Sequence, residues 1–448
     1  MTAAEPMDVV IVGAGFAGLG TAAALRRFGV RRFVVIERGW NVGAFWTGVY
    51  DRLHLHSPWH DLPEDGGLVR RYPMYKSRDE VLHYLDAYAH RFRLHARVRC
   101  GDTAMRIARA PAADGWIVET AQTAYHARYV VLATAMNREP TMPEVPDRPA
   151  FRGHVLHAAR YRNALPFAGQ RVLVVGSGNS AAEIALDLVD HGARAVDLWV
   201  RGPRHFLPRS RMTALFLVSR LLGMSSPRAL DRFQRVAPGT PPFARVVRQR
   251  DRLAGRIGLD LSRYGIRRPA AGPFTEMLTR GRVPVFDRGT ARAIGEERIG
   301  VVDGTARPLR GFTAHGVRLG DGETHYDAVL FATGFAPRLE PLLPDHARLL
   351  GPRPGGRAPR IDAQTRSTVE PTLFAPSFGV SLNGGAGLGR FGWAAGAQIA
   401  AELAAGSRLA TPPLATPAAR DRRQRAATAR AGAAGRRSRA AGASPSQT

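Results

Sequence analysis

The N-terminal residues combine glycines and an acid at a spacing that can bind a dinucleotide. Gly13, Gly15 and Gly18 follow the apolar run 9–12, and Glu37 ends a second apolar run. In such a unit the glycines permit a tight turn, close approach of a pyrophosphate and close helix packing, and the acid accepts hydrogen bonds from ribose hydroxyls. The set predicts a dinucleotide site. The alternative is a glycine-rich turn in an ordinary α/β domain.

A second glycine-rich turn repeats this pattern in the middle of the chain. Gly176 and Gly178 follow another apolar strand, Asn179 and Ser180 come next, and the second strand of this unit ends in Arg201. A carboxylate there would repel the 2'-phosphate of NADPH, whereas an arginine binds it in a charge-assisted pair. The first unit therefore predicts an FAD site and the second an NADPH site. The alternative for Arg201 is a surface arginine in an arginine-rich chain.

Each turn needs a strand before it and a helix after it, so the chain must fold as two α/β units. A flavin and a nicotinamide in one chain would meet for hydride transfer. The stretch HYDAVLFATGFAP at 325–337 echoes ARYVVLATAMNREP at 127–140, which suggests an insertion. We expect two Rossmann-like domains, with the NADPH-binding domain (166–325) inserted between two parts of the FAD-binding domain (1–165 and 326–410).

Residues 151–161 carry a fixed spacing of aromatic, small and basic residues just before the second turn. Phe151, Gly153, His157 and Tyr161 fit the pattern F-x-G-x-x-x-H-x-x-x-Y/F, which resembles the fingerprint of flavin-containing monooxygenases. Tyrosine at the last place favours this group over the Baeyer–Villiger group, which usually has tryptophan. The likeness covers most of residues 7–405, where the segments similar to YUCCA-type plant auxin-biosynthesis monooxygenases and their bacterial relatives are 50–63, 72–92, 174–188 and 266–290.

This resemblance implies an NADPH-dependent FAD monooxygenase. In that family NADPH reduces the flavin, and dioxygen adds at C4a to give a (hydro)peroxyflavin. That species oxygenates a soft N or S nucleophile or an α-keto acid such as indole-3-pyruvate, while the protein excludes water. The expected partners are a small substrate and dioxygen. The alternatives are a flavin reductase that uses another acceptor, Baeyer–Villiger-type oxygenation, and a flavoprotein without turnover; a dithiol acceptor is excluded because Cys100 is the only cysteine.

The resemblance also assigns individual residues. It makes His56 catalytic, at a place where many flavin-containing monooxygenases have asparagine and the plant enzymes have histidine, and where an imidazole could donate to the peroxide. It implies that His157 and Tyr161 hold the contact between the two domains and take no part in the chemistry. A metal site at His54 and His56 is the alternative, but no further ligands accompany them, and we expect no metal. The implied cofactor contacts are Gly13, Gly15, Phe16, Ala17, Gly18, Glu37, Arg38 and Trp46 for FAD, Gly176, Ser177, Gly178, Asn179, Ser180 and Arg201 for NADPH, and also Thr333 and Gly334.

Composition and charge bear on the partners and the location of the protein. The 448 residues carry a formal charge of +27, but the charge is spread along the chain and no nucleic-acid motif accompanies it, so we expect no nucleic-acid partner. No leader pattern is present at the N-terminus, and the apolar stretch 213–224 is too short to span a bilayer, which favours a cytoplasmic protein. Residues 411–448 lack large apolar side chains and predict a disordered basic tail. The sequence does not set an oligomeric state.

Overall fold

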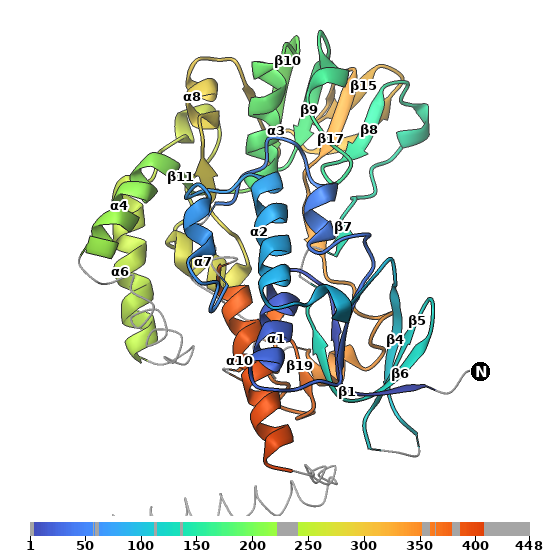
Figure 1. Ribbon diagram of the computed structural model, residues 1–448. Coiled ribbons are helices and arrows are strands. Elements are labelled where there is room, and N and C mark those ends of the chain that lie inside the picture. The colour runs from blue at the N-terminus through green and yellow to red at the C-terminus, as the bar shows by residue number, and fades with distance from the viewer. Residues whose placement is uncertain are drawn as a thin grey trace, which may run out of the picture. The chain divides into compact units, whose positions relative to one another are not determined.

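The computed structural model describes residues 4–56, 58, 62–111, 114–134, 138–221, 241–351, 359–362, 364–378 and 386–406. Residues 1–404 form one compact body, to which the following description applies. The predicted tail 411–448 lies outside the described residues. The expected α/β class is confirmed, with two mainly parallel sheets that each carry a glycine turn (Figure 1).

The first unit is built on a seven-stranded sheet, counted over the described residues, with the order β3-β2-β1-β6-β5-β4 and β19 paired to β6. Helix α1 (Phe16–Arg27) connects the adjacent parallel strands β1 and β2. Residues 9–12 of β1 are buried, as expected of a central parallel strand covered on both faces. The strands are β1 (Glu5–Val12), β2 (Phe33–Glu37), β3 (Val98–Cys100), β4 (Ala104–Arg109), β5 (Trp116–Thr120), β6 (Ala124–Leu132) and β19 (Leu373–Phe374).

The second unit repeats this arrangement on a five-stranded sheet with the order β13-β10-β9-β17-β8 among the described residues. All neighbouring strands are parallel, and α3 (Asn179–Asp190) connects β9 to β10. Its strands are β8 (His154–His157), β9 (Arg171–Val175), β10 (Ala195–Val200), β13 (Gly300–Asp303) and β17 (Ala328–Phe331). The two units therefore share one strand–turn–helix–strand plan.

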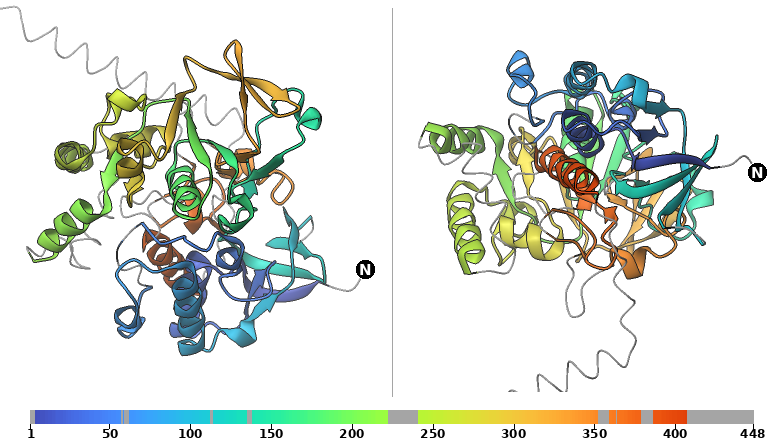
Figure 2. Two further views of the ribbon diagram at one scale, coloured as in Figure 1. Left: turned by 90° about the horizontal axis from the view of Figure 1, so that it is seen from above. Right: turned by 60° about the horizontal axis from the view of Figure 1, so that its bottom comes forward.

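The second unit interrupts the first, as expected. After β6 the chain builds the second sheet, and it then returns with β19 and with α10 (Ala386–Ala404), which packs along α1 (Figure 2). The two helix backbones are close, because a Cβ atom at Gly20 would lie 2.3 Å from the carbonyl oxygen of Gly389. Between the units, β7 (Glu139–Pro140) and β18 (Phe335–Ala336) pair antiparallel.

The exact domain boundaries remain a proposal. Strands β8 and β17 lie just outside the expected range 166–325, yet both belong to the second sheet. The reason is physical: residues 172–175 of β9 are buried, and β17 pairs along the edge of β9 that β10 leaves open. The second sheet thus begins before residue 166 and ends after residue 325.

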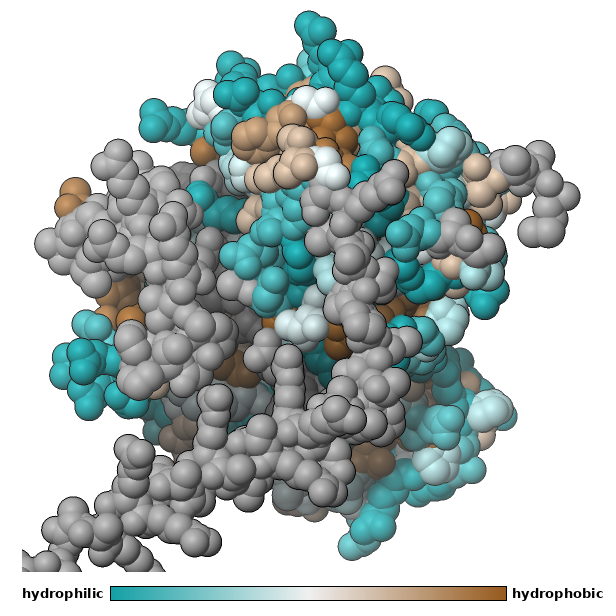
Figure 3. Space-filling model, turned by 90° about the horizontal axis from the view of Figure 1, so that it is seen from below, coloured by the Kyte–Doolittle hydropathy of each residue, from teal (hydrophilic) through white to brown (hydrophobic). Residues whose placement is uncertain are grey.

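The remaining elements surround these sheets. Helix α2 begins after a capping box formed by Ser77 and Glu80. None of the described helices is long and apolar enough to cross a membrane, and hydrophilic side chains dominate the coloured surface in Figure 3. These elements are α2 (Arg78–Arg91), α4 (Arg209–Leu221), α6 (Pro241–Ile257), α7 (Pro273–Arg280), α8 (Thr290–Gly295), α9 (His346–Leu349), β11 (Phe206–Pro208), β12 (Val285–Asp287), β14 (Leu309–Thr313), β15 (Gly316–Leu319) and β16 (Gly322–His325).

Candidate active site

The first glycine turn leaves open space at the start of α1. A Cβ atom would lie 2.5 Å from the Ala133 oxygen at Gly13 and 1.8 Å from the Gly13 oxygen at Gly18, so neither position accepts a side chain. At Gly15, by contrast, a Cβ atom would meet no described atom within 4 Å. Helix α1 begins with the buried residues Phe16 and Ala17 and has no side-chain cap. Its free N–H groups and the open space fit a pyrophosphate.

Glu37 is held beside this cradle by the turn itself. Its Oε2 accepts a hydrogen bond from the backbone N–H of Ala14 at 2.9 Å, and its Oε1 accepts one from Gly39 at 2.8 Å. Each carboxylate oxygen keeps a second lone pair. The carboxylate can therefore still accept hydrogen bonds from ribose hydroxyls, and its position fits the role proposed for it.

The other predicted FAD contacts have different surroundings. The Trp46 ring meets the Phe16 ring edge-on at 6.3 Å, which places it at the start of α1. Arg38 is exposed and lies 4.0 Å from Glu139. Thr134, which no sequence motif indicates, has a buried hydroxyl with no hydrogen bond to any described residue. It follows Ala133, whose backbone packs on Gly13. An unpartnered buried hydroxyl beside the cradle also fits a polar ligand there.

The second glycine turn has the same geometry. A Cβ atom at Gly176 would lie 2.5 Å from the Ala332 oxygen, and one at Gly178 would meet no described atom within 4 Å. Gly176 has a φ of +144°, which favours glycine. Ala181, fully buried, takes the place that Gly18 has in the first unit. This cradle therefore also fits a pyrophosphate at a helix N-terminus.

Arg204, three residues beyond the predicted Arg201, is the arginine that contacts this second turn. Both Nε and Nη2 of Arg204 donate to the Ser177 hydroxyl at 3.2 Å. Burial and then the charge of Arg282 lower the pKa of the Arg204 guanidinium. Arg201 is exposed, and its backbone oxygen accepts a hydrogen bond from Thr305. Arg201 and Arg204 are the two arginines of the motif RGPR. The role predicted for Arg201 stays a prediction, and the structure adds Arg204 as a second candidate.

Asn179 and Thr333, both predicted cofactor contacts, use their side chains to hold the fold. The amide of Asn179 donates to the Pro284 oxygen at 3.0 Å and accepts from the Phe286 N–H at 2.8 Å. The Thr333 hydroxyl donates to the Thr141 oxygen at 2.5 Å, and the Gly334 oxygen accepts from the Thr141 N–H at 2.9 Å. Each of the two side-chain atoms of Asn179 keeps a second hydrogen-bonding position, so the amide can still contact a cofactor.

Helix α3 joins the second unit to the segment 50–56 and to Tyr161. The Tyr50 hydroxyl donates to Glu183 Oε2 at 2.6 Å, and the Tyr161 hydroxyl donates to Asp187 Oδ2 at 2.6 Å. Burial, followed by the charge and hydrogen bond of Glu183, raises the pKa of Tyr50. Ser180 also lies within hydrogen-bonding reach of Tyr50. The Tyr161 ring also meets the Tyr50 ring at 6.3 Å, so Tyr161 lies where the segment 50–56 packs on the second unit, and its role at an interdomain joint stays a prediction.

His56 lies in this joint, at the end of the segment that follows the flavin turn. Its ring stacks on the Phe286 ring at 5.7 Å with an interplanar angle of 14°, and its Nδ1 lies 3.9 Å from Glu183 Oε1. Burial lowers the pKa of His56 more than the negative charge of Glu183 raises it. Burial therefore favours the neutral form of this imidazole.

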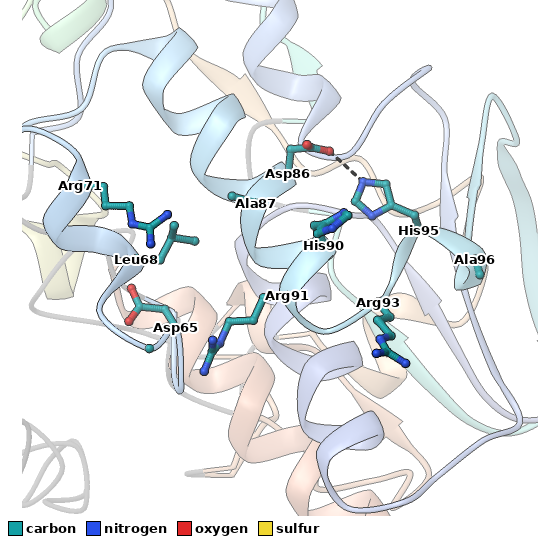
Figure 4. A pocket seen from close by; sticks show the side chains of 11 residues that line it. Asp65, Leu68, Arg71, Asp86, Ala87, His90, Arg91, Arg93, His95 and Ala96 are labelled. Carbon is teal, nitrogen blue, oxygen red and sulfur yellow. Dashed lines mark hydrogen bonds and ion pairs between the residues drawn. The ribbon is translucent and has the colours of Figure 1, made fainter.

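A groove of about 940 Å³ lies elsewhere, against the outer side of α2 (Figure 4). Its lining includes Asp86 and His95, whose side chains lie 2.8 Å apart, together with His90 and Arg91. None of the predicted site residues lines this groove. It is therefore separate from the two glycine turns and from His56.

Comparison with known proteins agrees with this arrangement. A profile of the pyridine nucleotide-disulphide oxidoreductase family matches residues 10–212. Probable indole-3-pyruvate monooxygenase YUCCA1 of Arabidopsis thaliana is 34% identical over 73% of this chain and 75% of that protein. Indole-3-pyruvate monooxygenase YUCCA8 of Oryza sativa subsp. indica is 35% identical over 76% of this chain and 78% of that protein.

Two solved structures share the fold. The flavin-containing monooxygenase of Stenotrophomonas maltophilia has a TM-score of 0.60 at 24% identity and covers 89% of this chain and 99% of its own. Cyclohexanone monooxygenase of Rhodococcus sp. Phi1, bound to NADP+, has a TM-score of 0.66 at 18% identity, over 91% and 85% of the two chains. The identity and coverage of the two plant relatives show that this chain is an oxidoreductase that belongs to the YUCCA-type flavin-dependent monooxygenases.

Proposed function

We propose that this chain is an NADPH-dependent FAD monooxygenase that oxygenates a small organic substrate. The substrate class proposed is an α-keto acid such as indole-3-pyruvate, named for the plant relatives, or a soft N or S nucleophile. The second substrate is dioxygen. Cyclohexanone monooxygenase, which shares the fold, was solved with NADP+ bound, and this supports the choice of nicotinamide.

The observation that carries the proposal is the pair of equivalent cradles with opposite charges beside them. Both turns leave open space at the second glycine, Gly15 and Gly178. Glu37 lies beside the first turn and Arg204 beside the second. A carboxylate suits ribose hydroxyls and repels a 2'-phosphate, whereas a guanidinium attracts that phosphate. The residues present therefore fit FAD in the first unit and NADPH in the second.

Bound FAD would supply the redox chemistry, since it takes a hydride from NADPH and activates dioxygen once reduced. The chain itself binds and orients. The N-termini of α1 and α3 would hold the two pyrophosphates. Tyr50 and Glu183 join the segment 50–56 to the second unit, and His56 places between the units an imidazole whose neutral form is favoured by burial. We assign the catalytic role to His56 because it is a titratable side chain that elements of both units surround.

The test begins with the purified full-length protein. We expect a flavin spectrum, or restoration of one by added FAD, and NADPH consumption in air. Indole-3-pyruvate, a tertiary amine and a thioether would then be added in turn, and oxygenated product and hydrogen peroxide would be quantified against NADPH consumed.

Product that accounts for most of the NADPH with one of these substrates supports the proposal and names the class. Peroxide that accounts for all the NADPH with every substrate would favour the flavin reductase alternative. A protein that stays colourless with added FAD and ignores NADPH would overturn both functions.

A further inference from the structure

Two buried polar atoms from different units face each other at the joint. His56 Nδ1 and Glu183 Oε1 are 3.9 Å apart, and neither atom has a hydrogen bond to any described residue. This distance suits an ion-pair contact and exceeds that of a hydrogen bond. Buried polar atoms nearly always have partners, so a small movement, or a bridging water, between these two atoms would satisfy both.

Glu183 is held in place from its other side. Its side chain is 5% exposed, and its second oxygen, Oε2, accepts the 2.6 Å hydrogen bond from the Tyr50 hydroxyl. This bond prevents the carboxylate from turning, so Oε1 remains directed at His56 and Arg288. Glu183 is the fifth residue of α3, the helix that opens the second cradle. The acid therefore belongs to the second unit and acts on a residue of the first.

Arg288 supplies the opposite charge at the same point. Its Nη1 lies 3.7 Å from Glu183 Oε1, donates to the Arg52 oxygen at 3.2 Å, and lies 3.0 Å from His54 Nδ1. The guanidinium is 17% exposed, and several partners on two elements fix it. It follows β12, the strand whose Phe286 stacks on the His56 ring.

The charges around His56 act in opposite directions. Glu183 on α3 raises the pKa of His56, while Arg288 after β12, Arg209 at the start of α4 and the neighbouring His54 lower it. Burial lowers it further and has the largest effect. An unpaired imidazolium is therefore disfavoured here at neutral pH.

We propose that Glu183 and Arg288 are positioning residues for His56. The Glu183 carboxylate fixes the tautomer that carries its proton on Nδ1, and the Arg288 guanidinium keeps the ring uncharged. Nε2 is then the nitrogen left with a lone pair, so it accepts a hydrogen bond or a proton and does not donate one. The importance of this state for oxygenation rests on the proposed function, but the state itself belongs to the protein.

The test is an NMR titration of the full-length protein labelled with 15N-histidine, with His56→Asn used to assign the signal. We expect wild-type His56 to show a protonated Nδ1, an unprotonated Nε2 and a pKa below 6.5. Glu183→Gln should lower that pKa further and Arg288→Met should raise it, each by about 1 or more, because a charge within 4–6 Å shifts a pKa by about 1–3. The Nδ1 tautomer should weaken in Glu183→Gln.

Asp187→Asn is the matched control. Asp187 lies one helical turn beyond Glu183 on α3 and contacts Tyr161 and Arg52, so its change should leave the His56 titration in place. A wild-type proton on Nε2, or shifts of the same sign in Glu183→Gln and Arg288→Met, would overturn the proposal. Loss of structure in these variants would appear in the other histidine signals. In that event Tyr50→Phe, which frees the Glu183 carboxylate and should weaken the Nδ1 tautomer, replaces Glu183→Gln.

The outcome is independent of turnover. If His56 titrates as expected and no substrate is oxygenated, the proposed function fails and the positioning inference stands. If substrate is oxygenated and the two variants leave the His56 signal unchanged, the positioning inference fails alone.

Discussion

Replacing Arg204 with glutamine should raise the KM for NADPH and leave the KM for NADH nearly unchanged. The Arg204 guanidinium contacts the second glycine turn, where it donates two hydrogen bonds to the Ser177 hydroxyl. Burial and then the charge of Arg282 lower the pKa of this guanidinium, and the charge of Glu276 raises it by less. The 2'-phosphate of NADPH would bind more tightly beside this positive charge, whereas NADH has no 2'-phosphate.

The size of the effect follows from the kind of bond lost. A hydrogen bond to a charged group contributes about 1.5–3 kcal/mol, and each 1.4 kcal/mol is about tenfold in affinity. Arg204→Gln should therefore raise the KM for NADPH by about 10- to 150-fold and leave the KM for NADH nearly unchanged. Arg201→Gln removes an exposed charge without a contact to Ser177, so its effect should stay below about fivefold.

The assay is steady-state oxidation of each nicotinamide by the FAD-loaded enzyme, followed by absorbance in air. Circular dichroism controls for folding, and Ser177→Ala tests whether the serine anchors the guanidinium. Equal losses with NADH and NADPH would show that Arg204 only supports the turn. A large, NADPH-selective loss in Arg201→Gln with none in Arg204→Gln would return the role to the arginine chosen from sequence.

Three further changes test the cradle, the joint and the pH response. Gly15→Ala should keep the Tm of the FAD-free protein, because its Cβ meets no described atom, but should bind FAD more weakly, because that Cβ enters the space left for the pyrophosphate. Gly18→Ala should also lower the Tm of the FAD-free protein, since its Cβ would lie 1.8 Å from a backbone oxygen; equal Tm values for the two FAD-free variants would refute this. Tyr161→Phe leaves Asp187 without its 2.6 Å donor, so urea unfolding should show a loss of about 1–3 kcal/mol, and a loss near zero would show that this bond does not stabilise the second unit. Burial lowers the pKa of His157 below 6.5, so the unfolded chain binds the proton more tightly, and stability should fall as pH drops below about 6.5; His157→Gln should flatten that slope in unfolding measured from pH 8 to 5.

Local patterns were enough to predict the fold and the turns. A glycine turn depends on residues within one strand–turn–helix unit, and the apolar runs before Gly13 and Gly176 are buried strands, as predicted. The echo between 127–140 and 325–337 correctly indicated an insertion. It could not place the boundaries, because β8 and β17 are separated in sequence by almost the whole second unit and join it only through sheet pairing.

The site residues divide along the same line. The cofactor roles predicted for the glycines and Glu37 follow from position within a unit and stay predictions. Arg201 and Arg204 stand three residues apart, and the sequence does not show which of them folds back over Ser177. For Asn179 the sequence predicts a cofactor contact, and the structure adds side-chain hydrogen bonds to Pro284 and Phe286.

By itself, then, the sequence was enough to predict the family, the two strand–turn–helix units and their glycine turns. These features depend on local spacing and backbone sterics. Only the tertiary structure brought Glu183, Arg288 and His56 together. These three residues come from α3, from the loop after β12 and from the first unit, far apart along the chain. The state of His56 depends on burial and on charges a few ångströms away, and those distances exist only once both units have folded.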